Sequence, residues 1–228
     1  MYISKYKLNT TSIMKKSILV IIITLAIGVQ VKSQDDFSPS GNFSFDLNFD
    51  PAAIFDAAAG SVFTMPFIKG RYFLGSGSAI RLGLSAEFDS DKEYSDADGD
   101  ISVKNSSMLI GIAPGYEKQF GTKRFYFYLG GELPITSYST KSKAEYNGDT
   151  YVSKNPGNSG YFGIGLHFVI GVDFYIFPNF YLGAEFTPGY IFRKYYDETV
   201  DDDVTTKGGF GSSFGLSSSS GIRLGVRF

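Results

Sequence analysis

The chain has 228 residues, a net charge of −2, 43% hydrophobic residues, 17% aromatic residues and no cysteine. Without cysteine, a disulfide framework, a thiolate nucleophile, a cysteine-bound metal and an acylated lipoprotein cysteine are all excluded. The charge lacks the basic excess that is typical of nucleic-acid-binding proteins, so we expect no nucleic-acid partner. The apolar fraction is sufficient for one folded domain.

An export signal is predicted at the N-terminus. Lys15 and Lys16 precede an apolar run over residues 17–29, and small residues precede a cleavage site before Gln34. The run is shorter than the about 20 apolar residues that a membrane-spanning helix needs. We therefore predict these boundaries: a start at Met14, an N-terminal extension and signal peptide within residues 1–33, and a β-domain over residues 34–228.

From residue 41 onward, apolar and polar residues alternate with a period of two, which is typical of half-buried strands. In the first such segment, Phe43, Phe45 and Leu47 alternate with polar residues. The same pattern occurs in eight segments, which cover residues 41–50, 64–74, 79–88, 106–117, 124–135, 161–175, 180–190 and 214–228.

The connections between these segments alternate in length. Long connections cover residues 51–63, 89–105, 136–160 and 193–213, and short ones cover residues 75–78, 118–123 and 177–179. Outer-membrane barrels have long external loops and short periplasmic turns. The pattern predicts an all-β fold, an eight-stranded antiparallel up-and-down transmembrane β-barrel, which must close because an open edge in lipid leaves backbone groups unpaired.

The polar face of the segments is predicted to line the lumen. It is rich in glycine, which makes room in a narrow barrel, and its charges nearly balance, as buried charges require. The apolar face has no charge in the middle of a segment, and a charge facing lipid would cost about 2–4 kcal/mol. A soluble barrel with the opposite orientation is the alternative. The predicted lumen charge network consists of Asp46, Lys69, Arg71, Arg81, Glu87, Glu117, Arg124, Glu132, His167, Asp173, Glu185, Arg223 and Arg227.

The final strand, GIRLGVRF, resembles the C-terminal signal of outer-membrane barrels, and the matching positions are Ile222, Leu224, Val226 and Phe228. In that family the signal is read by the barrel-assembly machinery. The stretches PFIKGRYFLGSGSAIRLGLSAEF and GYEKQFGTKRFYFYLGGEL are similar to hairpins of small OmpA/OmpX-like and OmpW-like barrels, especially the "porin family" proteins of Bacteroidetes. The resemblance implies the outer membrane of a Gram-negative bacterium, with outer-membrane lipids and lipopolysaccharide as partners.

Few residues suggest chemistry. His167 is the only histidine, and a general base of a lipid-modifying barrel enzyme is the alternative to a hydrogen-bonded lumen residue. We expect the lumen residue and no catalytic role, because no nucleophile can be assigned beside it. The acidic segment over residues 89–100 includes DADGD, which departs from a calcium-binding EF-hand loop in its glycine position and lacks the closing glutamate. A solvated acidic loop is expected there, with no metal and no cofactor.

The leading functional hypothesis is a structural or surface-interaction barrel whose lumen is filled by side chains, with any surface ligand bound through the external loops. The main alternative is a narrow channel for small or apolar solutes, and the second alternative is the lipid-modifying enzyme.

Overall fold

The computed structural model describes residues 41–49, 68–75, 77–95, 101–146, 149–216 and 221–228. No helix in these ranges is long and apolar enough to cross a membrane. The predicted signal peptide and its cleavage site lie outside the described residues, as does the predicted connection over residues 51–63.

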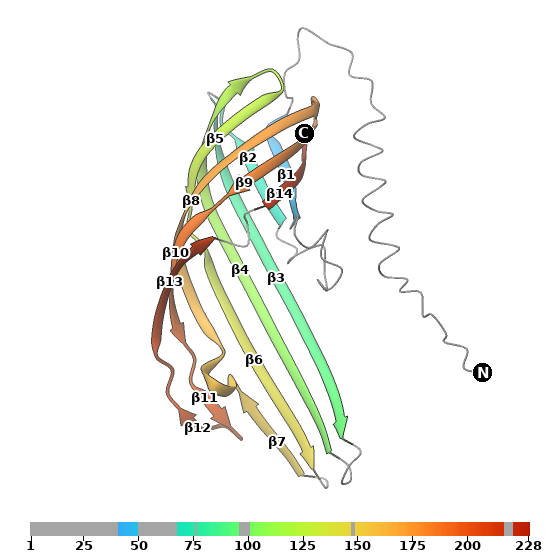
Figure 1. Cartoon of the computed structure of the whole chain (residues 1–228), viewed down its shortest axis with the longest axis vertical. Helices are drawn as coiled ribbons and strands as arrows, with labels where there is room; N and C mark the ends of the chain where they lie inside the picture. The colour runs from blue at the N-terminus through green and yellow to red at the C-terminus, as the bar shows by residue number, and fades with distance from the viewer. Residues whose placement is uncertain (1–40, 50–67, 76, 96–100, 147–148, 217–220) are drawn as a thin grey trace, which may run out of the picture.

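Antiparallel strands make up most of the described chain (Figure 1). Each of the eight predicted segments overlaps at least one of them. The strands are β1 (Phe43–Phe49), β2 (Ile68–Phe73), β3 (Ser78–Ser95), β4 (Ile101–Thr122), β5 (Phe125–Glu132), β6 (Ile135–Tyr146), β7 (Asp149–Lys154), β8 (Tyr161–Phe177), β9 (Phe180–Phe186), β10 (Pro188–Tyr195), β11 (Glu198–Val200), β12 (Asp203–Thr206), β13 (Phe210–Leu216) and β14 (Gly221–Arg227), with one short 3-10 helix, η1 (Pro156–Asn158).

Eight of these strands form a closed ring in the order β1-β2-β3-β4-β5-β8-β9-β14. The ring closes because β14 pairs with β1. At the junction, the N–H of Phe43 donates to the carbonyl of Phe228 at 2.9 Å, and the N–H of Phe228 donates to the carbonyl of Phe43 at 2.8 Å. The predicted eight-stranded antiparallel fold is confirmed.

Several ring strands continue beyond the ring as a second strand. β4 pairs with β6 up to the Ile112–Ile135 pair and with β5 from the Gly115–Glu132 pair onward. Pro134 separates β5 from β6, because proline has no N–H to donate to a ladder. β9 and β10 are likewise separated only by Thr187, and both pair with β8.

The predicted long loops are wrong for the most part, because strands extend through them. β3 continues to Ser95, β6 and β7 form a hairpin, and so do β11 and β12. These hairpins join into one sheet in the order β12-β11-β7-β6-β4-β3, at the end of the molecule opposite the C-terminus (Figure 1). The polar composition of these segments predicts loops, but the backbone hydrogen bonds of a ladder need no apolar side chains.

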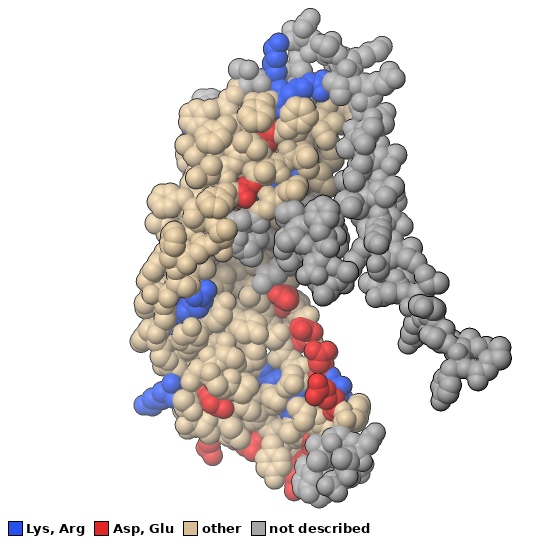
Figure 2. Space-filling model, viewed as in Figure 1, with Lys and Arg blue, Asp and Glu red and all other residues tan. Residues whose placement is uncertain are grey.

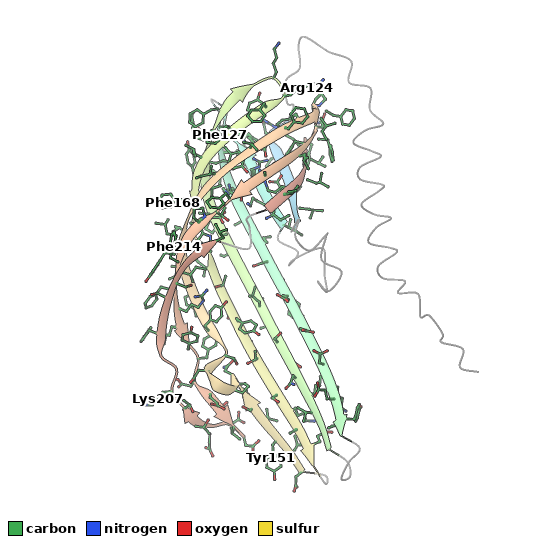
Figure 3. All side chains as sticks on the ribbon, viewed as in Figure 1. Arg124, Phe127, Tyr151, Phe168, Lys207 and Phe214 are labelled. Atoms are coloured by element: carbon green, nitrogen blue, oxygen red, sulfur yellow. The ribbon has the colours of Figure 1, made fainter. Side chains whose placement is uncertain are left out.

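Apolar side chains point outward from the ring and charged ones point inward. Phe168 on β8 is 64% exposed and lies on the outer side in Figure 3, as does Phe214 on β13 beyond the ring, which is 74% exposed. Asp46 and Arg223 are fully buried. A soluble monomer rarely exposes a contiguous apolar patch of more than a few hundred Å². The predicted orientation of the two faces is therefore confirmed, and the soluble alternative with an apolar interior is wrong.

Candidate functional site

The interior of the ring holds a dense cluster of charged side chains, which we call the lumen network. Each of the eight ring strands contributes to it, because alternate residues point inward and the pairing register aligns them. All of its members are buried. The members are Asp46 from β1, Lys69 and Arg71 from β2, Arg81 from β3, Glu117 from β4, Glu132 from β5, His167 and Asp173 from β8, Glu185 from β9, and Arg223 from β14.

Ion pairs of the lumen network connect opposite walls of the ring. Arg71 Nη1 lies 2.8 Å from Asp173 Oδ2, and β2 lies opposite β8 in the ring order. Arg81 Nη2 lies 2.8 Å from Glu185 Oε1, and β3 lies opposite β9. Side chains that meet across the full width leave no open passage between them at this level, as expected for a ring of eight strands.

Single members of the lumen network contact several others, and Arg223 and Glu185 are examples. Arg223 lies 2.9 Å from Asp46 and 2.6 Å from Asp173, and it also contacts the hydroxyl of Tyr128. Glu185 accepts hydrogen bonds from Lys69, from Arg81 and from the Tyr128 hydroxyl. The network is therefore continuous, and no single ion pair in it is independent of the others.

Charges of opposite sign nearly balance in the lumen network. It holds four basic side chains and five carboxyl groups, and His167 Nδ1 lies 3.5 Å from an oxygen of Glu132. Neighbouring Arg71 and Arg81, which face each other across β2 and β3, both contact Glu117 at 3.0 Å. A buried charge is tolerated only when it is paired and hydrogen-bonded, so these contacts offset the cost of burying the charges.

Tyrosine rings and glycines complete the packing around the charges. Tyr128, Tyr175 and Tyr181 are almost completely buried, and the Tyr181 hydroxyl donates to Asp46. A Cβ atom at Gly225 would lie 2.0 Å from the Tyr181 ring, and one at Gly171 would lie 2.1 Å from the Tyr128 hydroxyl. Glycines on the inner face thus provide the space that the rings occupy.

Gly225→Ala is expected to lower the free energy of unfolding by about 1–3 kcal/mol, because the new methyl group overpacks against the buried Tyr181 ring. The matched control is Gly215→Ala on β13, where a Cβ atom would meet nothing within 4 Å. Urea unfolding of both variants in lipid vesicles checks this. Equal midpoints for the two variants would show that the inner glycines are not needed for packing.

A pocket of about 220 Å³ adjoins the lumen network on the side of the extended hairpins. Glu132 and His167 line one part of it, and Tyr161, Ile191 and Arg193 line another. The guanidinium of Arg193 lies 5.2 Å from the Tyr161 ring and donates to the Ser213 hydroxyl at 2.7 Å. The pocket is therefore a vestibule that is lined by both polar and apolar side chains and ends at the lumen network.

Three residues predicted for the lumen network lie elsewhere. Glu87 is exposed, because it follows Leu84, the last residue of β3 paired with β2, and so lies beyond the described ring. Arg124, at the β4–β5 turn, donates to the carbonyl of Ile176 at 3.2 Å. Arg227 donates to the carbonyl of Gly41 at 2.8 Å. Both arginines lie at the rim near the short turns, since alternation predicts the face of a residue and not its depth.

The C-terminal positions predicted as an assembly signal lie on β14 and at its end, on the outer side. Ile222, Val226 and Phe228 are exposed and Leu224 is half-buried. The Phe228 ring lies 5.7 Å from the Phe45 ring on the neighbouring strand. These residues therefore belong to the apolar exterior at the closing strand.

The acidic residues predicted to form a loop lie largely on a strand. Asp89, Asp91 and Glu93 are alternate residues of β3, roughly 7 Å apart along the strand, so they do not wrap around one ion. Figure 2 shows acidic side chains in a row beside β3. Asp96, Asp98 and Asp100 lie outside the described residues. Within the described ranges, no three His, Asp or Glu residues gather as metal ligands.

The lumen also holds uncharged side chains that do not belong to the predicted charge network. Tyr181 and Thr187 are completely buried, and Ser44 accepts a hydrogen bond from Arg71. Each lies at an alternate position to a member of the lumen network on the same strand or directly after it, so the period of two places all three on the inner face.

Comparisons with known proteins give similarity to solved structures alone, since no protein-family model and no curated protein matches the sequence. Outer membrane protein W of E. coli has 15% identity, covers 83% of this chain and 99% of its own, and gives a TM-score of 0.40. CarO2 and CarO of Acinetobacter baumannii have 10% and 11% identity, each over 82% of this chain and 96% of their own, with TM-scores of 0.32 and 0.31. Similarity of this kind concerns the fold and not the function.

Proposed function

We propose that this chain is an integral outer-membrane barrel whose lumen is closed by the lumen network and whose role is structural or is exerted at the cell surface. The observation that carries the proposal is the pair of contacts between opposite walls, Arg71 with Asp173 and Arg81 with Glu185. Side chains that meet across the whole interior block solute passage, and they leave the outer hairpins as the part that partners can reach.

The outer face of the ring supports insertion into a membrane. Exposed Leu82, Ile110, Leu166 and Leu182 lie on different ring strands. At the level where all eight strands pair, the ring is closed by the pairing of β1 with β14. A closed ring satisfies its backbone groups without water, as hydrocarbon requires. The C-terminal strand resembles the assembly signal of outer-membrane barrels, so it would be the element that the barrel-assembly machinery of a Gram-negative bacterium reads. A Bacteroidetes origin stays a prediction.

The extended hairpins support a role at the surface. They form one continuous sheet instead of separate loops, because β7 pairs with β11 as well as with β6. Their polar side chains and hydrogen-bonded backbones present a rigid surface outside the apolar region, and binding residues are often positioned in this way on a scaffold. A surface ligand would therefore bind at this sheet.

Enzymatic activity is not part of the proposal. His167 is buried and lies beside Glu132, and no hydroxyl nucleophile within the described ranges makes a hydrogen bond to its ring. A general base needs its nucleophile within hydrogen-bond reach. The His167–Glu132 pair thus fits the edge of the lumen network better than a catalytic pair.

The purified protein, folded in detergent, is expected to insert into planar lipid bilayers without producing steady single-channel currents. Insertion is checked independently by recovery of the protein in the membrane fraction and by a faster gel mobility of the unheated, folded form. Well-resolved steps from the wild-type protein would overturn the closed lumen and favour the narrow channel. Recovery as a soluble protein would overturn the membrane assignment.

A further inference from the structure

The two faces of the extended sheet carry opposite charges. On the inner face, β3 presents Glu87, Asp89, Asp91 and Glu93 at alternate positions. The outer face of the same sheet carries five lysines, which we call the lysine face. They are the exposed Lys92 on β3, Lys104 on β4, Lys141 on β6 and Lys154 on β7, and the half-buried Lys143 on β6. General solubility would be served by mixed charges, so this sorting by face points to an anion outside the sheet.

The lysines stand directly opposite one another across the ladders. Lys92 pairs with Lys104, and Lys104 pairs with Lys143. Lys141 pairs with Lys154 in the next row. Like charges placed opposite each other repel and destabilise a sheet. An anion bound between the rows would offset this repulsion.

Carboxylates neutralise only part of the lysine face. Glu145 lies 2.5 Å from Lys143 and Asp202 lies 2.7 Å from Lys154, and each lysine lowers the pKa of its partner carboxyl by hydrogen bonding and by its charge. Lys104 and Lys141 form no ion pair with any carboxylate of the described chain. The face therefore keeps an excess of positive charge.

The lysine face begins where the apolar exterior ends. On the outward side of β3 and β4, Phe88 and Met108 pair with each other and are exposed. Outward residues recur roughly every 7 Å along each strand. The next outward residue of β4 after Met108 is Ser106, which pairs with Lys141 of β6, and the one after that is Lys104. Charged groups at this distance from an apolar surface lie at the depth of lipid headgroups.

From these observations we infer that the lysine face binds the phosphate groups of an outer-leaflet phosphoglycolipid beside the barrel. The inference rests on the proposed membrane insertion, since only that brings lipid headgroups next to the outward side of β3, β4 and β6. The position directly above the apolar exterior favours a lipid phosphate over a soluble one.

The test uses the full protein folded in an uncharged detergent and titrated with diphosphorylated lipid A, with bound lipid counted by native mass spectrometry. The variant Lys104→Gln with Lys141→Gln is expected to bind about thirtyfold more weakly, because each lysine removed from a membrane surface lowers the affinity about fivefold. The matched control, Lys123→Gln with Lys207→Gln, removes the same charge from exposed sites off the lysine face and should bind like the wild type.

Dephosphorylated lipid A is expected to bind all three proteins equally and weakly. Equal affinity of the Lys104/Lys141 variant and the wild type for diphosphorylated lipid A would overturn the inference, as would displacement of that lipid by inorganic phosphate at a similar concentration. Gel mobility of the unheated protein shows that each variant is folded. Failure of this inference therefore differs from failure of the proposed function, which would appear as wild-type current or as a soluble wild-type protein.

Discussion

Arg223→Met is expected to lower the free energy of unfolding by about 3–5 kcal/mol, the range found when one partner of a buried ion pair is removed. Arg223 is fully buried and contacts Asp46, Asp173 and Glu185. Methionine fills much of the same volume, so the loss comes mainly from charge. Without Arg223, three cations would remain in the lumen network beside five carboxylates. Urea unfolding in lipid vesicles measures the effect.

The matched control for this substitution is Arg193→Met on β10. Arg193 is half-buried, faces the vestibule and donates one hydrogen bond to Ser213, so its replacement should change stability by roughly 0.5 kcal/mol or less. Adding Asp173→Asn to Arg223→Met should restore part of the lost stability, because it removes one of the uncompensated carboxylates. Similar losses for Arg223→Met and Arg193→Met would mean that the network does not stabilise the ring.

The period of two was sufficient to predict the ring and its two faces. Phe43, Phe45 and Leu47 point outward, and Ser44, Asp46 and Asn48 point inward, because successive side chains of a strand must lie on opposite faces. The short connections alternate with the long ones, so they are all predicted at the same end of the barrel. Alternation and connection length are local properties of the chain, so both can be recognised in a single sequence.

Depth along the barrel could not be predicted in the same way. Glu87 and Arg81 have the same parity on β3, yet Arg81 is buried and Glu87 is exposed. Which residues share a level depends on the register between neighbouring strands and on how the ring closes through β1 and β14. The contact between Arg71 and Asp173 results from that closure, because their strands are not neighbours.

The hairpins beyond the ring were missed for a different reason. Residues 136–146 are rich in serine, threonine and lysine and have little apolar alternation, so their sequence predicts a loop. Their strands are held by backbone pairing with β4 and β7 and not by burial. Polar strands of this kind have no hydrophobic period, although the Thr and Tyr residues in them favour strands.

Truncation of one bridge across the lumen is expected to open a conducting path. Arg71→Ala combined with Asp173→Ala removes both sides of a contact between opposite walls and leaves no unpaired charge of that pair. The space they vacate lies at the level where the interior is blocked, and water can fill it because the surrounding groups are polar. Single-channel steps should therefore appear in planar bilayers where the wild-type protein gives none.

Glu87→Ala combined with Arg193→Ala is the matched control for this opening. It removes one charge of each sign from positions that lie outside the lumen network, so its lumen should stay closed. Both variants must first show the gel mobility of the folded form. A folded Arg71/Asp173 variant that stays silent would show that other side chains block the passage, and steps from the control would show that the barrier lies in the vestibule. Steps from the Arg71/Asp173 variant alone would identify the bridge between β2 and β8 as the barrier.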